Sequence, residues 1–217
     1  MSERENETVD GAAEIEQDVA SCVASQQSLV ESLRGMGDAD PTAPSRLPAW
    51  TVGHVLTHIA RNADSIVSML DGNDQYPHGV AGRNADIEEG ARRSWPALVD
   101  DVAVSADAVQ RWLLDVDDWA GMVVMVGGER PKRLVPQLRQ REVEVHRVDL
   151  GLGSEFADMP ADYVRRDLRL MEMLWTARKP VGMTPIPHAA LAVPPAERLS
   201  WLMGRSDIEG VAAADLF

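Results

Sequence analysis

The sequence predicts a mainly α-helical protein, with a four-helix bundle over residues 14–152 and a small α+β domain over residues 153–217. Four long segments carry apolar residues at helical spacing, and connections rich in proline and glycine join them. After Gly153, proline becomes frequent and only one further long helical segment remains. Residues 1–13 are mostly polar and acidic, so we expect them to form a disordered tail.

The first two predicted helices are separated by a proline-rich connector. Residues 12–34 form the first helix, and residues 37–49 form a connector that crosses some distance without helix. The second helix opens after Thr51, a good N-cap residue, and ends at Gly72. Its apolar stripe consists of Val52, Val55, Ile59, Ile66 and Leu70.

The later segments continue the helical pattern with one interruption by a strand. A third helical region runs from about residue 83 to 115, with a break or restart at residues 94–96. Residues 122–126 and the two glycines after them predict a strand and turn, and residues 133–150 predict the fourth long helix. A further helix is expected over 160–179, followed by short apolar pieces at 189–193 and 199–203 between prolines, which we interpret as the α+β domain.

Composition and charge narrow the classes of protein to which this chain can belong. Apolar residues make up 45% of the 217 positions, which is typical of a soluble globular protein with a sizeable core. No run of about 18 apolar residues occurs, so we expect no membrane span. The net charge of −14 disfavours nucleic acid as a partner, since basic surfaces bind phosphates. The acidic start lacks the apolar core of a signal peptide, and a cytoplasmic location is expected.

The single cysteine, Cys22, excludes an internal disulfide framework. It lies within the apolar pattern of the first predicted helix, where we expect a buried side chain. A reaction that needs a thiol would therefore take that thiol from another molecule.

Two helices carry residues that can bind a metal ion. Glu142 and His146 are four residues apart in the fourth long helix and project from the same face. Alone, such a pair is more often an ordinary surface contact. The second helix, however, offers His54 and His58 one turn apart, and one of them with the pair would make three ligands on two packed helices. Three protein ligands leave a position open, as in catalytic zinc sites.

The motifs around these residues resemble the mycothiol-dependent maleylpyruvate isomerase family, which belongs to the DinB-like metal-binding helical bundles. The matching stretches are residues 50–59 (WTVGHVLTHI) and 141–150 (REVEVHRVDL). The resemblance runs from about residue 14 and includes Arg83-Asn84 and Gly204-Arg205. It implies a DinB-like bundle, a divalent metal such as zinc, and mycothiol as the thiol.

The resemblance also assigns functions to individual residues. The metal ligands of the family fall on His58, Glu142 and His146, whereas His54 falls on a variable position and is expected at the helix N-terminus or behind the ligands. The catalytic arginine of the family corresponds to Arg205, and Arg83 corresponds to an arginine at the mouth of the bundle that we expect to bind substrate.

These residues predict a zinc-dependent, mycothiol-using isomerase or S-transferase. In this hypothesis the metal activates the thiol for addition to a small electrophile, and Arg205 pairs with a carboxylate or enolate oxygen of that substrate. The segment between Gly151 and Arg205 is short and the chain stops at Phe217, so the electrophile is not assigned as maleylpyruvate itself. The sequence carries no signal for an oligomeric state.

Two alternatives stay open at this point. One is a metal-binding bundle without thiol chemistry, acting as a stress or partner-binding module. The other is a metal-dependent hydrolase that uses Glu144 or another acid as its base. Of the other polar candidates, His78 and His188 are expected to be solvated or packed, and Asp149 and Asp100-Asp101 to be exposed charges or helix-end contacts.

Overall fold

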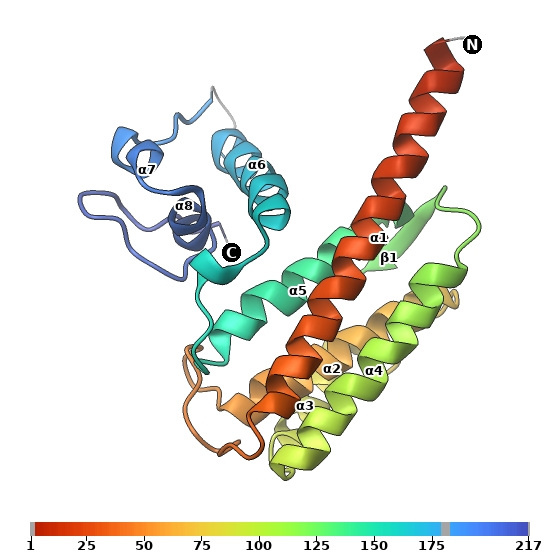
Figure 1. Cartoon of the computed structure of the whole chain (residues 1–217), viewed down its shortest axis with the longest axis vertical. Coiled ribbons are helices and arrows are strands. Elements are labelled where there is room, and N and C mark those ends of the chain that lie inside the picture. The colour runs from red at the N-terminus through yellow and green to blue at the C-terminus, as the bar shows by residue number, and fades with distance from the viewer. Residues whose placement is uncertain (1–2, 179–182, 217) are drawn as a thin grey trace. The chain divides into compact units, whose positions relative to one another are not determined.

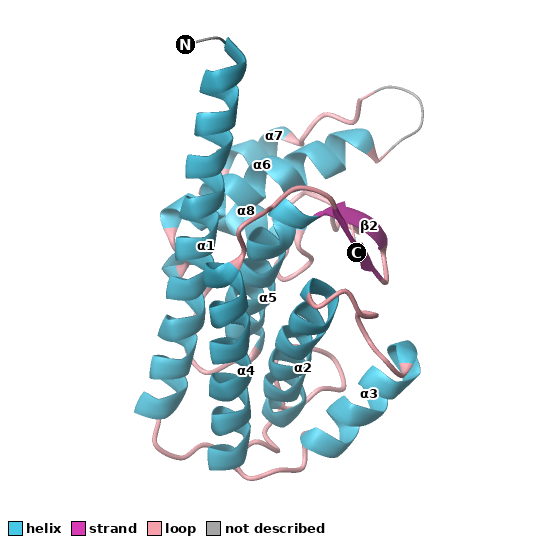
Figure 2. Cartoon of the chain, turned by 90° about the vertical axis from the view of Figure 1, so that its right-hand side faces the viewer, coloured by secondary structure: helices cyan, strands magenta, loops and turns pink. Residues whose placement is uncertain are grey.

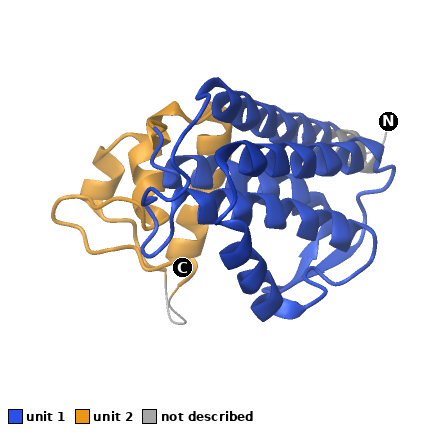
Figure 3. Cartoon of the chain, turned by 90° about the horizontal axis from the view of Figure 1, so that it is seen from below, with its two compact units in different colours: residues 1–152 blue, residues 153–217 orange. Residues whose placement is uncertain are grey.

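The structure, a computed structural model, describes residues 3–178 and 183–216, with side chains from Ala13 onward. The chain divides into two compact units, residues 1–152 and 153–217 (Figure 3). Each unit is described by itself below.

Four long helices of the first unit form a bundle in which α1 runs parallel to α5 and α2 runs parallel to α4, with the two pairs in opposite directions (Figures 1 and 2). Helices α1 and α2 each pack against both α4 and α5, so that α1 and α2 occupy opposite corners of the bundle. A shorter helix, α3, packs on α2. The helices of this unit are α1 (Glu3–Gly35), α2 (Val52–Leu70), α3 (Gly79–Gly90), α4 (Trp95–Asp115) and α5 (Val135–Asp149). The predicted mainly α-helical bundle is therefore confirmed.

The bundle core is apolar along most of its length. Each Leu, Ile or Val that is fully buried there stabilises the fold by about 1.5–3 kcal/mol. One cluster of buried side chains joins all four helices and includes Leu29, Leu33, Val55, Ile59, Leu98, Val102 and Val143. A second cluster fills the other end and includes Val19, Cys22, Ile66, Met69, Val109, Val123 and Val135.

The start of α2 is fixed by a cap and by a close backbone approach. Thr51 is the N-cap, as predicted, and its side-chain oxygen accepts a hydrogen bond from the backbone N–H of His54. The N–H of Gly53 donates to Pro41 O at 2.8 Å. A Cβ at Gly53 would overlap the carbonyl of Ala91, so only glycine fits this position without a shift of backbone.

The predicted break in the third helical region is present, and the predicted strand and turn form the first part of a two-stranded hairpin. The region divides into α3 and α4, and Pro96 lies in the first turn of α4, where its missing N–H costs nothing. Strands β1 (Met122–Met125) and β2 (Gly128–Pro131) are antiparallel, with Met125 opposite Gly128. A 3₁₀ turn, η1 (Lys132–Leu134), then leads into α5.

The first helix begins earlier than the sequence suggests. The prediction places a disordered tail at residues 1–13, whereas the backbone of α1 is helical from Glu3. The glutamates near its start are good helix formers, and their charge is favourable at a helix N-terminus. Residues 1–2 lie outside the described part of the chain.

The second unit is helical in its described residues, where the sequence predicts an α+β domain. Its elements are η2 (Phe156–Asp158), α6 (Ala161–Ala177), α7 (His188–Ala192) and α8 (Pro195–Leu202), and α6 packs against α8. The two short apolar segments of this domain are helical: the first lies in α7 and the second forms the end of α8. A proline precedes each helix, and alanine and leucine favour helical structure. Trp175 and Trp201 lie in contact, with ring centroids 4.7 Å apart.

None of the helices in the described ranges combines the length and the apolar character that crossing a bilayer requires.

Candidate metal centre

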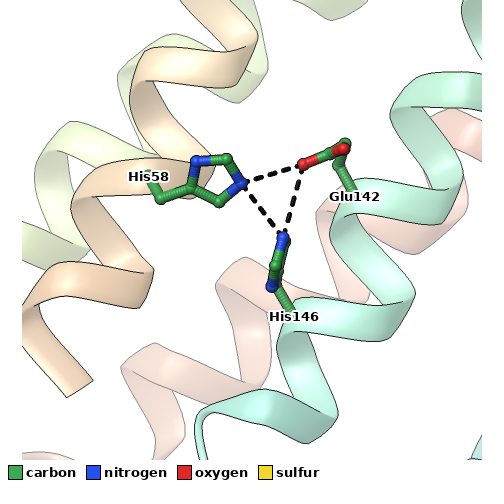
Figure 4. Close-up of side chains that lie close together, drawn as sticks. All are labelled: His58, Glu142 and His146. Atoms are coloured by element: carbon green, nitrogen blue, oxygen red, sulfur yellow. Dashed lines mark hydrogen bonds and ion pairs between the residues drawn. The ribbon is translucent and has the colours of Figure 1, made fainter. Parts of the chain in front are cut away.

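Three side chains from α2 and α5 meet inside the bundle (Figure 4). Nε2 of His58 lies 2.9 Å from Oε2 of Glu142 and 3.0 Å from Nε2 of His146. Nε2 of His146 lies 3.4 Å from the same Glu142 oxygen. One donor atom from each residue therefore points to a common centre. The structure brings together the three residues that the resemblance assigns as ligands.

A buried arginine fixes α5 against its neighbours just before the site. Arg139, one turn ahead of Glu142, is 1% exposed. Its Nη1 donates to Ile59 O at 2.9 Å and to Asn62 Oδ1 at 2.8 Å on α2, and its Nε donates to Gln26 on α1. Burial lowers the pKa of Arg139 from its ordinary value. These bonds set the register between α2 and α5, and so place His58 opposite Glu142 and His146.

Asp149 lies directly behind His146 at the end of α5, so of the two predicted alternatives the helix-end contact is found and the exposed charge is wrong. Its side chain is buried, and Oδ2 lies 2.8 Å from Nδ1 of His146, one turn away on α5. The spacing of three residues between the two was visible in the sequence. Burial was not, because it depends on what covers the end of α5.

His58 has a different group behind it. Nη2 of Arg83, on α3, lies 3.0 Å from Nδ1 of His58. The guanidinium also lies over the ring of Tyr76, and Trp50 packs against His58 with ring centroids 5.5 Å apart. Arg83 thus lies at the candidate site, where its partner is the candidate ligand His58.

His54, the other histidine of α2, is a capping residue. Nδ1 of His54 accepts a hydrogen bond from the backbone N–H of Thr51 at 3.2 Å and lies 2.8 Å from its hydroxyl. Nε2 of His54 lies 3.4 Å from Glu88 on α3. Both ring nitrogens therefore face groups other than the candidate ligands.

The proximity of the three candidate ligands shifts their titration. Burial works to raise the pKa of Glu142, but hydrogen bonds from His146 and His58 outweigh it and hold that pKa well below its ordinary value. Burial works to lower the pKa of His146, yet hydrogen bonds to Asp149 and Glu142 raise it to about 9. For His58 burial prevails and lowers the pKa, against the effect of Glu142.

The donor set fits a divalent cation of the zinc type. Two imidazole nitrogens and one carboxylate oxygen are a common catalytic zinc set, with bonds of about 2.0–2.2 Å. In a tetrahedral site such bonds put neighbouring donor atoms about 3.3 Å apart. The three spacings here, 2.9, 3.0 and 3.4 Å, are near that value. A fourth position would be left for a further ligand.

Glu144, the base in the hydrolase hypothesis, is turned away from this centre. It stands two residues from both Glu142 and His146 on α5, which corresponds to about 200° around the helix. The structure therefore does not bring Glu144 together with the three candidate ligands.

Arg205, the predicted catalytic arginine, belongs to the second unit. It follows Gly204, whose φ of +69° ends α8. The N–H groups of Gly204 and Arg205 donate to Trp201 O and Ser200 O, a Schellman motif that requires a residue able to adopt this φ. Arg205 lines a cavity of about 400 Å³ within its own unit, together with Trp201, Ser206, Asp207 and Asp215.

The first unit places two histidines and a glutamate on facing helices. This arrangement puts the protein in the class of helical bundles with a candidate metal-binding site between their helices. The profile of a particular family, described as the mycothiol maleylpyruvate isomerase N-terminal domain, matches residues 22–151. The chain belongs to that family.

Solved structures agree with this assignment. A crystal structure of mycothiol-dependent maleylpyruvate isomerase matches with a TM-score of 0.74 and 21% identity, over 88% of this chain and 90% of that one. A crystal structure of a mutant of that enzyme matches with the same TM-score and coverage at 20% identity. At these identities the likeness establishes the fold. No curated protein matches the chain.

Proposed function

We propose that this protein is a mycothiol-using enzyme that works on a small electrophilic carboxylate, as a cis–trans isomerase or an S-transferase. The observation that carries the proposal is the convergence of His58, Glu142 and His146 in a bundle of the isomerase family. A divalent metal bound there, zinc in our proposal, would lower the pKa of a thiol and so supply thiolate near neutral pH for addition to the electrophile.

The residues of the chain would hold this chemistry in place. His58, Glu142 and His146 hold the metal from two packed helices, and their donor atoms already converge. Trp50 covers one side of His58 and reduces the access of water from that side. Arg83 lies behind His58 with a guanidinium that can bind a substrate carboxylate.

The catalytic arginine of the proposal is Arg205. Its support is the resemblance of Gly204-Arg205 to the family motif, together with its position in a cavity of the second unit. A guanidinium stabilises a carboxylate or enolate oxygen by charge-assisted hydrogen bonds, and this is worth most where negative charge grows during the reaction.

The test is turnover of the purified protein with metal and mycothiol varied independently. The substrate is a cis-enedione carboxylic acid, and loss of the cis isomer is followed with the metal measured in the same sample. We expect turnover only when both zinc and mycothiol are present. Turnover that needs metal but not thiol would favour the hydrolase alternative, and bound metal with no turnover of this or other electrophiles would favour the binding module.

A further inference from the structure

We infer that Asp149 is a positioning residue that holds His146 in the tautomer and orientation in which its Nε2 faces a metal ion. The inference rests on the proposed function in one respect, because it takes His58, Glu142 and His146 to bind that ion.

The geometry around His146 is that of a ligand supported from behind. Oδ2 of Asp149 lies 2.8 Å from Nδ1 of His146, and a carboxylate can only accept a hydrogen bond from it. Nδ1 is therefore the protonated nitrogen, and the lone pair that can bind a metal is on Nε2. That atom is the one that faces His58 and Glu142. A carboxylate in this place also raises the basicity of a metal-binding imidazole.

Asp149 is held in place by its surroundings. It is the last residue of α5 and is 0% exposed. Its carbonyl accepts a hydrogen bond from the N–H of Arg46 at 2.8 Å, and Gly151, with φ of +70°, turns the chain away directly afterwards. Burial of a carboxylate is costly unless polar groups satisfy it, so the hydrogen bond with His146 helps to stabilise Asp149 in its buried position.

The opposite histidine lacks such support. Arg83, which lies behind His58, has only hydrogen-bond donors, so Nδ1 of His58 must accept from it. The proton of a neutral His58 then lies on Nε2, where it donates to Glu142. In the metal-free protein the neutral histidines are thus held in opposite tautomers, so a cation bound by both Nε2 atoms would displace a proton from His58 but not from neutral His146. Of the two residues behind the histidines, Arg83 and Asp149, we therefore expect Asp149 to contribute more to metal affinity.

The test compares two carboxylate-to-amide variants in the full-length protein. Asp149→Asn should weaken zinc binding about 10- to 100-fold, measured by competition with a chromophoric chelator. It should also shift the visible absorption bands of the Co²⁺-loaded protein, which report the ligand geometry. The matched control is Asp101→Asn. Asp101 binds Arg61 and Arg93 in the same bundle but contacts no candidate ligand, so that variant should keep its zinc affinity.

Unchanged zinc affinity and an unchanged Co²⁺ spectrum in folded Asp149→Asn would overturn the inference. If this variant does not fold, the ¹⁵N-labelled wild-type protein decides, because long-range ¹H–¹⁵N spectra of the zinc-loaded form identify the tautomer of His146. A proton on Nδ1 supports the inference, and an unprotonated Nδ1 contradicts it. Zinc binding without thiol-dependent turnover would refute only the proposed function, whereas a wild-type protein that binds no zinc would refute both.

Discussion

The bundle and the C-terminal unit are stabilised in different ways. The bundle has long helices with continuous apolar faces, and buried hydrogen bonds such as those of Arg139 fix one helix against the next. In its described residues the C-terminal unit has one long helix and two short ones that follow prolines, with a Trp175–Trp201 contact between α6 and α8. Arg205, the proposed catalytic arginine, follows α8 in the turn formed by Gly204.

This difference bears on the chemistry that each unit can support. Metal ligands need donor atoms fixed to within a fraction of an ångström, and packed helices provide such precision better than turns do. A guanidinium that pairs with a substrate carboxylate does not itself bind the metal, so in the proposed reaction its position affects the substrate and not the metal content. We therefore expect variants of the three candidate ligands in the bundle to change metal content, and variants of Arg205 to change the reaction rate without changing metal content.

The largest effect is expected for the three candidate ligands. Replacement of His58, Glu142 or His146 by Ala should remove most of the bound metal and reduce turnover to the level of metal-free protein, because two remaining ligands hold zinc weakly. Metal content after dialysis, measured by elemental analysis, is the readout.

His54→Ala is the control for these variants, because His54 lies on the same helix and contacts Thr51 and Glu88. It should weaken the cap of α2 and keep the metal. Equal loss of metal from His54→Ala, with retention in His58→Ala, would mean that the site uses the other turn of the helix.

The second effect concerns the C-terminal unit. Arg205→Ala should leave metal content unchanged and reduce kcat/KM by roughly 100-fold or more, as expected for the loss of a charge-assisted contact. Arg205→Lys should be partly active, because it keeps the charge but loses the bidentate fork. Steady-state kinetics with a carboxylate substrate gives the comparison.

A matched control exists within the same unit. Arg198 forms an ion pair with Glu172, with Nε 2.8 Å from the carboxylate oxygen, and supports the packing of α8 on α6. Arg198→Ala should lower the stability of the unit but leave kcat/KM of the folded protein near the wild-type value. If Arg205→Ala turns over normally, Arg205 is structural and the active site belongs to the bundle alone.

The sequence predicts the bundle better than the C-terminal unit for a physical reason. In α2, an apolar stripe, a Thr51 cap and a terminating glycine all indicate the same helix, and the structure agrees. In residues 153–217 the segments between prolines are too short for periodicity to separate strand from helix. For this reason the sequence predicts an α+β domain where the structure has the helices α7 and α8.

In the candidate site, too, features set by local spacing can be predicted from the sequence, whereas features set by tertiary packing cannot. The spacing of Glu142 and His146 is local, and it is enough to place both side chains on one face of α5. The choice of His58 over His54 came from the resemblance, since both histidines stand at suitable intervals on α2. The position of Asp149 behind His146, and of Arg83 behind His58, depends on burial and on packing between helices, which a single sequence does not display.

A smaller effect is expected from pH in the metal-free bundle. His146 has its pKa raised from 6.5 to about 9 in the folded protein, so the folded state holds its proton more tightly than the unfolded state does. The resulting stabilisation is complete below pH 6.5 and is lost as the pH rises through about 9. Thermal unfolding of chelator-treated protein across this range should show a falling midpoint, and the fall should be smaller in His146→Asn. Parallel curves for the two proteins would contradict this assignment.

The smallest effect is expected for Cys22, which lies in the bundle core away from solvent and is 0% exposed. Its sulfur lies 3.9 Å from Nε2 of Gln26, and its apolar neighbours include Val19 and Ile66. Cys22→Ala removes one atom from a packed core, so we expect a loss of about 1 kcal/mol in the free energy of unfolding, measured by denaturant titration. Turnover with mycothiol should stay close to wild type, because in the proposed reaction the thiol comes from another molecule. An inactive Cys22→Ala protein that is folded and loaded with metal would instead identify an internal nucleophile and exclude mycothiol as the source of the thiolate.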